Sequence, residues 1–285
     1  MRLGITAFLT DLAMPPADLA VAVEERGFDS LYLPEHTHLP VRADTPPALV
    51  DGVSPDDYRR SLDPLVALAT AASVTRRISL GTGVVLAAQH DPIVLAKQLA
   101  TLDHLSGGRV VFGMGFGWNR EEAADHGLAF GDRRAVAREK VLCMQALWSG
   151  DPAEFHGDHI SLDPCWSRPK PVQQPRIATL VGGGANAPVF EAVAEYADGW
   201  LPIGGAGLAE ALPRLRRAVA ERGRDPEGIR VVPFGTVPTD SKLDHFRHQG
   251  ITEVVLRVPS GPAASMLSVL DAHAAFVDRF GSTDD

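Results

Sequence analysis

The sequence predicts an α/β fold, a (β/α)8 TIM barrel, and three observations lead to this prediction. Eight short apolar, β-branched segments alternate with stretches of helical periodicity along the 285 residues. Several expected strands, such as VVFGMG and EVVLRV, are almost continuously apolar, as in a parallel sheet that is covered on both faces. The length suits a barrel, which typically takes ~250 residues. We therefore expect a single barrel domain over residues 1–285.

The expected strands follow one another at intervals that leave room for a helix or a loop between them. They are Leu3–Phe8, Ser30–Pro34, Ile78–Leu86, Arg109–Gly113, Arg176–Val181, Gly199–Ile203, Ile229–Phe234 and Glu253–Val258. Two helices have clear starts, because Asp63-Pro64 and Asp91-Pro92 each place a capping acid before a proline at the first helical position. A doubly wound dinucleotide-binding sheet is the rival fold, but the turn after the first strand, residues 10–16, contains no glycine.

Two connections are longer than the usual 2–6 residues. One insertion follows the second strand, from His36 to about Ser61, and the other follows the fourth strand, from Ser149 to Pro175. The second contains the hairpin-like stretch FHGDHISL. Because barrel active sites lie at the carboxyl ends of the strands, we expect both insertions to help cover the pocket.

Composition excludes several classes of protein. The net charge of −9 and the absence of a basic stripe argue against a nucleic-acid binder. No apolar run is long enough to cross a membrane, and the first residues lack the features of a signal peptide, so we expect a cytoplasmic protein. Cys143 and Cys165 form no CxxC pattern. Lysine supplies only 4 of the 27 basic residues, a bias typical of high-GC genomes such as those of actinobacteria.

The first candidate site is Pro34-Glu35-His36-Thr37-His38, at the end of the second strand. Glu35 and His36 are candidates for an acid/base pair, since histidine titrates near neutral pH. His36 and His38 also resemble a metal pair, but the ends of later strands (GMGFG, LVGGG, WLPIGG) offer no further ligand, and we expect no metal. A polar loop histidine without a catalytic role is the alternative.

Three glycine-containing segments follow or interrupt strands. Gly81-Thr82-Gly83-Val84 lies inside the third strand, where glycine marks either a bulge or close backbone packing. Gly113–Trp118 follows the fourth strand and would let a flat ligand approach, with Trp118 stacking on it. Gly182–Asn186 leads into a helix near Ala187, and successive N–H groups there would bind an anion such as phosphate. An ordinary turn is the alternative for each of the last two.

Other candidates carry less weight. His90 follows the third strand and is expected either at the pocket edge or in a solvated turn. Arg257 interrupts the last strand and would either meet an anion or pair with Glu253. Nucleophilic catalysis has no support, because there is no G-x-S-x-G motif and neither cysteine has a nearby base.

In this order, the motifs resemble those of the luciferase-like monooxygenase superfamily, and most closely its branch of oxidoreductases that use coenzyme F420, a deazaflavin. The resemblance extends over essentially the whole chain and is most specific over Leu80–Asn119. It rests on YLPEHTH, on LGTGVVLAAQHDPIVLAKQLATLDHLSGGRVVFGMGFGWN, on LVGGGANAP and on YADGWLPIG.

The resemblance implies a bacterial luciferase-like barrel with the cofactor at its mouth and a cis peptide bond between Gly83 and Val84 behind the central ring. Glu35 and His36 would lie near the reactive edge of that ring. The remaining cofactor contacts would come from Phe116, Gly117 and Trp118, which line its channel, and from Gly182, Gly183, Gly184, Ala185 and Asn186, which hold its phosphate.

The sequence departs from the family pattern at two places. Several relatives have aspartate in place of Glu35, and some have a charged or polar residue near the position of Trp118. Trp118 cannot supply a charge, and Glu121 is a substitute by nearness only.

Three functional hypotheses follow. The first is an F420-dependent oxidoreductase that transfers hydride to or from a small organic substrate, which the high-GC bias favours over an FMN-dependent monooxygenase that works with a flavin reductase. The second is a flavin- or F420-binding protein with little activity, and the third is a metal-dependent hydrolase. Because relatives are commonly dimers, the resemblance also implies a homodimer.

Overall fold

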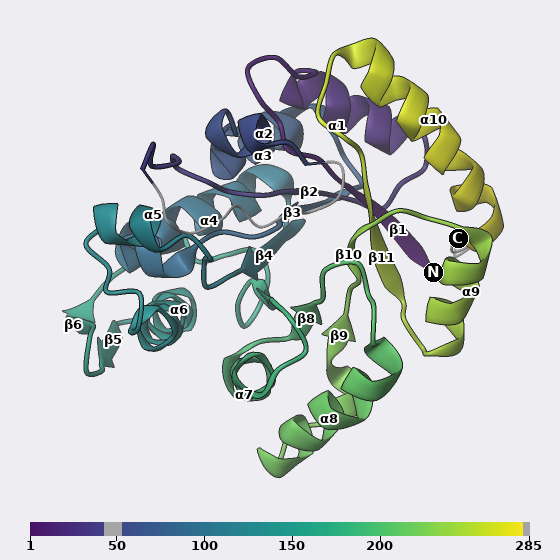
Figure 1. Cartoon of the computed structure of the whole chain (residues 1–285). Coiled ribbons are helices and arrows are strands. Elements are labelled where there is room, and N and C mark those ends of the chain that lie inside the picture. The colour runs from purple at the N-terminus through teal and green to yellow at the C-terminus, as the bar shows by residue number, and fades with distance from the viewer. Residues whose placement is uncertain (43–52, 282–285) are drawn as a thin grey trace.

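Nine parallel strands form one curled sheet, with the helices along its outer side (Figure 1). The computed structural model describes residues 1–42 and 53–281. The sheet order is β10-β11-β1-β2-β3-β4-β7-β8-β9, and β5 and β6 pair separately as an antiparallel hairpin. The strands are β1 Arg2–Thr6, β2 Ser30–Leu33, β3 Ser79–Thr82, β4 Val110–Met114, β5 Ala153–His156, β6 Ser161–Cys165, β7 Ala178–Gly182, β8 Gly199–Leu201, β9 Arg230–Val231, β10 Phe234–Thr236 and β11 Glu253–Arg257.

The helices alternate with the strands and pack against their neighbours around the outside, α1 on α3, α3 on α4, α4 on α6 and α7 on α8. No helix in the described part of the chain is long and apolar enough to span a membrane. The helices are α1 Pro16–Glu25, α2 Pro55–Arg59, α3 Pro64–Val74, α4 Pro92–Ser106, α5 Arg120–Asp125, α6 Arg133–Ser149, α7 Ala187–Tyr196, α8 Leu208–Glu221, α9 Asp240–His248 and α10 Ala263–Phe280, with short 3-10 turns η1 Ala87–Gln89 and η2 Pro226–Gly228.

The local helix signals in the sequence are confirmed. The side chain of Asp63 accepts a hydrogen bond from Val66 N at the start of α3, and that of Asp91 accepts bonds from the first turn of α4. Each acid precedes a proline, whose missing N–H would have no partner at this position of a helix. The stretch around FHGDHISL forms the β5–β6 hairpin, as expected.

Two expected strands differ from the structure. The strand expected over Ile78–Leu86 ends at Thr82, because the backbone then leaves its ladder with β2 and Leu86 N donates to the carboxylate of Glu35. The strand expected over Ile229–Phe234 is divided into β9 and β10, since Pro233 between them has no N–H to give to a ladder. The other six agree with the expected strands to within two residues at either end.

The segment that contains β9 and β10 lies between β8 and β11. On one side, Val232 N donates to Trp200 O, and Phe234 N donates to Pro202 O. On the other side, Val255 N donates to Pro233 O. Residues 230–236 therefore link the first strand in the sheet order, β10, to the last, β9.

The first expected insertion is described only in part, because residues 43–52 lie outside the described residues. Its described portion includes α2, which places the buried Tyr58 near the carboxyl end of β2. The second expected insertion contains the β5–β6 hairpin, and the expectation that it covers the pocket is wrong: it packs on α6, and none of residues 149–175 lines the cavity at the strand ends.

Apolar side chains separate into two clusters according to the face of the sheet that they occupy. In β11, Val254 and Leu256 belong to the large cluster between sheet and helices, and Val255 between them belongs to a smaller one. That smaller cluster fills the inside of the curled sheet, and its buried members are Tyr32, Val111, Leu180, Leu201, Val232 and Val255.

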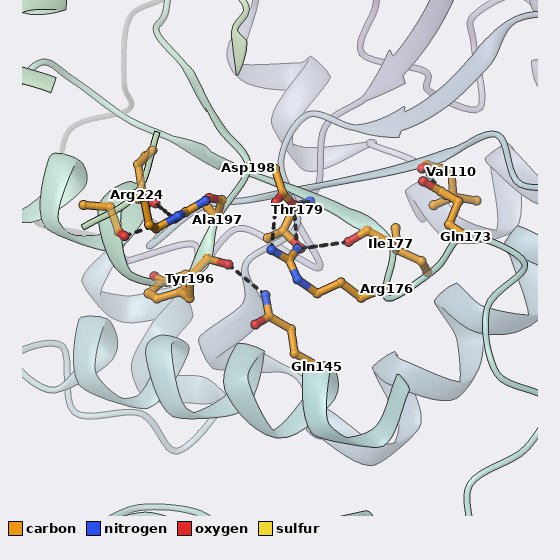
Figure 2. A network of polar contacts seen from close by, with 12 residues as sticks. Val110, Gln145, Gln173, Arg176, Ile177, Thr179, Tyr196, Ala197, Asp198 and Arg224 are labelled. Atoms are coloured by element: carbon orange, nitrogen blue, oxygen red, sulfur yellow. Dashed lines mark hydrogen bonds and ion pairs between the residues drawn. The ribbon is translucent and has the colours of Figure 1, made fainter. Parts of the chain in front are cut away.

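Charged side chains fasten the amino ends of β7 and β8 (Figure 2). Both guanidinium Nη atoms of Arg176 donate to the carboxylate of Asp198, at 2.5 and 2.7 Å, and Thr179 N donates to the same carboxylate at 2.8 Å. Arg224 donates to the carbonyl groups at the end of α7, including that of Ala197. Bidentate pairs of this kind fix direction as well as distance.

We expect Asp198→Ala to lower the free energy of unfolding by about 2 kcal/mol, because it removes charge-assisted hydrogen bonds from a half-buried site. Asp244→Ala is the matched control, since it removes an exposed pair with Arg247 that is worth about 0.5 kcal/mol or less. Denaturant unfolding followed by tryptophan fluorescence measures both. Equal losses in the two variants would contradict the expectation.

Candidate active site

A cavity of about 330 Å³ opens where the strands of the sheet end. Its walls come from residues that follow successive strands, which is where active sites lie in (β/α)8 barrels. The volume lies within the range of small-molecule and cofactor sites, about 300–1,000 Å³. Strand ends contribute Glu35, Val84, Phe116, Gly183, Ile203 and Arg257.

His36 on the cavity wall forms a buried pair with Glu122. His36 Nδ1 lies 2.9 Å from Glu122 Oε2, and the Glu122 side chain is fully buried. A carboxylate oxygen accepts hydrogen bonds, so Nδ1 is the nitrogen that donates. In the neutral imidazole the other ring nitrogen, Nε2, then carries no hydrogen and is a proton acceptor.

Glu122 was not among the candidates from the sequence, which named Glu121 as the nearest carboxylate. The side chain of Asn119 accepts a hydrogen bond from Glu122 N at 3.0 Å, so the cap of α5 places Glu122 one turn into the helix. The sequence signal was the cap itself, because an asparagine followed three residues later by glutamate marks a helix start. That signal fixes the helix but not the distant histidine that the glutamate meets.

Glu35 also lines the cavity, but its carboxylate bonds to the segment that follows β3. Leu86 N donates to Glu35 Oε2 at 2.7 Å, and His90 Nε2 lies 2.9 Å from Glu35 Oε1. Glu35 and His36, adjacent in the sequence, thus belong to two separate carboxylate–imidazole pairs. His90 does not line the cavity in the described structure, and it bonds to Glu35 from behind the wall.

Aromatic rings surround His36. The Tyr58 ring lies 5.1 Å and the Trp118 ring 5.6 Å from the imidazole, each in an edge-to-face arrangement, and the two rings are 5.9 Å apart. Phe8 extends this wall through its contact with Tyr58. The rings shield one side of the imidazole from water and give the cavity an apolar wall.

The bond between Gly83 and Val84 is cis, which confirms the expectation drawn from the family. Val84 lines the cavity, and glycines on two sides make room for it. A Cβ on Gly182 would lie 2.7 Å from Val84 Cγ1, and one on Gly115 would overlap Val84 Cγ2. Packing therefore explains these two glycines, whereas Gly117 has φ +73° and no close neighbour at the Cβ position.

The turn between β7 and α7 contains the residues that were expected to hold a phosphate. Trp200 Nε1 donates to Gly183 O at 2.8 Å, and Asn186 caps α7 through Val189 N. Gly182, Gly183, Gly184 and Asn186 line the cavity, whereas Ala185 is exposed and does not. The remaining candidates, Gly83, Val84, Phe116, Gly117 and Trp118, line it as well. Their functional roles stay predictions.

The alternatives for charged residues are resolved by geometry. Arg257 lines the cavity, and Glu253 pairs instead with Arg230 and accepts a hydrogen bond from Ser30 Oγ. His38 pairs with Asp125, away from His36. Within residues 1–42 and 53–281, no three His, Cys, Asp or Glu side chains are grouped as metal ligands would be.

Comparison with known proteins assigns the chain to a family. Residues 16–261 match the model of the luciferase-like monooxygenase family, and the chain belongs to this family. An uncharacterized protein of Mycobacterium tuberculosis is 41% identical over 99% of this chain and 98% of its own length. The F420-dependent glucose-6-phosphate dehydrogenase of Kineococcus radiotolerans is 32% identical over 73% of this chain and 59% of its own length. Both relatives come from actinobacteria, in agreement with the origin that the low lysine content predicts.

Solved structures share the fold. A monooxygenase from Streptomyces bottropensis has a TM-score of 0.80 at 21% identity, with 99% of this chain and 100% of that chain covered. The coenzyme F420-dependent tetrahydromethanopterin reductase of Methanopyrus kandleri has a TM-score of 0.74 at 17% identity, with 98% of this chain and 100% of that chain covered. An FMN complex of a Baeyer–Villiger monooxygenase component from Pseudomonas putida has a TM-score of 0.65 at 18% identity, with 87% of this chain and 71% of that chain covered. Deazaflavin and flavin enzymes thus both share this fold.

We expect Glu35→Gln to lower the pKa of His90. Burial acts to lower this pKa, but the hydrogen bond with Glu35 and its negative charge outweigh burial, so the pKa lies above the ordinary value. Glutamine keeps an acceptor oxygen for Leu86 N and removes the charge. An NMR titration of the His90 imidazole should give a pKa below the ordinary value of ~6.5 in the variant, and an unchanged pKa would contradict this account.

The same pair predicts a pH-dependent contribution to stability. Because the pKa of His90 is raised on folding, the contribution is complete below the ordinary pKa of histidine and is lost as pH rises through the raised value. The difference in unfolding free energy between wild type and Glu35→Gln should therefore be larger at about pH 5.5 than at about pH 8.5. In a His90→Gln background this pH dependence should disappear.

Proposed function

We propose that this protein is an oxidoreductase that transfers a hydride between coenzyme F420 and a small organic substrate. The observation that carries the proposal is the buried His36–Glu122 pair, which places a proton-accepting nitrogen on a cavity wall beside an apolar, glycine-bounded floor. The similarity to an F420-dependent dehydrogenase supports the choice of cofactor. An FMN-dependent monooxygenase is the nearest alternative, since FMN enzymes share the fold.

The cavity residues fit a flat cofactor with an anionic end. Val84, Leu201 and Phe234 offer an apolar surface for a ring system. At Gly184 the space where a Cβ would stand is open, with Asn186 Nδ2 the nearest atom at 3.7 Å. The backbone can therefore approach a phosphate at the start of α7, where the helix dipole favours negative charge.

Each residue of the pair has a distinct task in the proposed reaction. When bound, the deazaflavin supplies the site that accepts or gives the hydride. His36 Nε2 takes the proton that the substrate releases as the hydride leaves its carbon, and returns it in the reverse direction. Glu122 holds Nδ1–H and so keeps the ring turned with Nε2 available. Trp118 and Tyr58 exclude water from this face.

We also propose that the curled sheet is a (β/α)8 barrel in which residues 230–236 supply the seventh strand. The hydrogen bonds of this segment to β8 on one side and to β11 on the other support closure. Cytoplasmic location, a single domain and a homodimer remain predictions.

Titration of the apoprotein with F420 and with FMN tests the proposed cofactor. We expect tight F420 binding, well below ~100 μM, and much weaker FMN binding, measured by tryptophan fluorescence and ligand absorbance. The reverse preference, with oxygen-dependent turnover in the presence of a reductase, would favour the FMN monooxygenase.

We expect His36→Ala to lower the rate of hydride transfer by about 100-fold while F420 affinity stays within threefold. Glu122→Gln should lower it by about 10-fold, because the amide no longer fixes the orientation and charge of the imidazole. His38→Ala is the matched control, since this neighbouring histidine is partly exposed, does not line the cavity and pairs with Asp125. Single-turnover oxidation of reduced F420 by a substrate found in a screen measures the rate. Unchanged turnover in His36→Ala would show that His36 has no catalytic role, and negligible turnover in wild type as well would support the binding protein with little activity.

A further inference from the structure

Three arginines gather at one edge of the cavity, and we call them the arginine cluster: Arg120, Arg133 and Arg134. Arg133 Cζ lies 3.7 Å and Arg120 Cζ 4.4 Å from the centre of the Phe130 ring. Arg134 Cζ lies 4.9 Å from the centre of the Phe116 ring, which lines the cavity. Arg133 and Arg134 line the cavity themselves.

The positive charge of the cluster is not neutralised within the part of the chain that the structure describes. None of the three guanidinium groups forms an ion pair with a described carboxylate. Arg133 Nη1 donates to Phe130 O, but the buried atoms Arg133 Nε and Arg134 Nη1 have no hydrogen-bond partner among the described residues. Buried donors without partners are rare in proteins and are costly.

Two further features disfavour this arrangement in the protein by itself. The pKa of Arg133 is lowered, first by burial and then by repulsion from Arg134 and Arg120. In addition, α6 begins with Arg133 and Arg134, although the positive end of a helix dipole disfavours positive charge there; its N-cap residue Asp132 makes no side-chain capping bond, and its first turn holds no acid. A bound anion would relieve both effects.

The cluster and the glycine turn share one cavity. Gly182, Gly183, Gly184 and Asn186 line it together with Arg133 and Arg134. Arginine is suited to this place, because a planar guanidinium is weakly hydrated and recognises carboxylates and phosphates through paired donors. A ligand held by its phosphate at the turn can therefore continue with further anionic groups toward the cluster.

We propose that the arginine cluster binds the carboxylates that coenzyme F420 carries beyond its phosphate, in its glutamyl tail. This inference rests on the proposed function. FMN ends at its phosphate and has no group for this subsite, so the cluster would select the deazaflavin over the flavin.

The test compares Arg133→Gln/Arg134→Gln with wild type in binding three ligands: F420 with its glutamyl tail, the same deazaflavin phosphate without glutamates, and FMN. We expect the variant to bind tailed F420 about 30-fold more weakly, which is the loss of about 2 kcal/mol, and the other two within threefold of wild type. Arg216→Gln/Arg217→Gln, an exposed pair of neighbouring arginines on α8, should bind all three like wild type.

Two outcomes would overturn the proposal. Equal weakening of the tailed and tailless deazaflavins would assign the cluster to the phosphate, and no weakening would remove it from the site. The single variant Arg134→Gln repeats the comparison if the double variant unfolds.

Thermal unfolding of the apoprotein separates failure of this subsite from failure of the proposed function. In chloride, the double variant should be at least as stable as wild type, because repulsion between the arginines is removed. Inorganic phosphate at equal ionic strength should stabilise wild type and not the variant. If wild type binds no deazaflavin, the proposed function fails and the tail assignment with it. A phosphate effect confined to wild type would still locate an anion subsite here, and its absence would remove that as well.

Discussion

The buried carboxylate of Glu35 is the contact on which the geometry of the cavity depends. It stands at the end of β2 and binds Leu86 N and His90, both of which belong to the segment after β3. That segment includes Val84, whose side chain fits between Gly115 and Gly182 at the ends of β4 and β7. Glu35 and Val84 together thus connect four neighbouring strand ends, and both carboxylate oxygens of Glu35 have hydrogen-bond partners, as a buried polar group requires.

The two carboxylate–imidazole pairs differ in their surroundings, and only one of them is proposed to take part in the reaction. Glu35 lines the cavity and holds the segment after β3 together with His90, whereas His36 lines the cavity and bonds to Glu122 behind it. The second pair has the arrangement of an oriented base, in which one ring nitrogen donates to a carboxylate and the other is free to exchange a proton. Aromatic rings that line the cavity beside His36 restrict access of water to one side of the imidazole.

Charge is distributed unevenly over the molecule. The protein as a whole carries a net charge of −9, yet arginine side chains line the cavity. Arginines gathered at one edge of a cavity in a protein of negative net charge direct anionic ligands to that edge. This distribution would suit the anionic cofactor proposed above, because the cavity has apolar residues such as Val84, Leu201 and Phe234 in one part and arginines at its edge.

The sequence by itself determined the features whose causes are local. Apolar runs located six of the eight expected strands, and Asp63 and Asp91 located two helix starts, because capping acts within one turn. Family motifs also located the cis bond at Gly83-Val84 and most of the cavity wall. The tertiary structure alone decided that His36 meets Glu122, 86 residues away, and that Glu35 turns to His90. Such pairings depend on how separate helices and loops meet over the sheet, and no short-range pattern of residue types encodes that meeting.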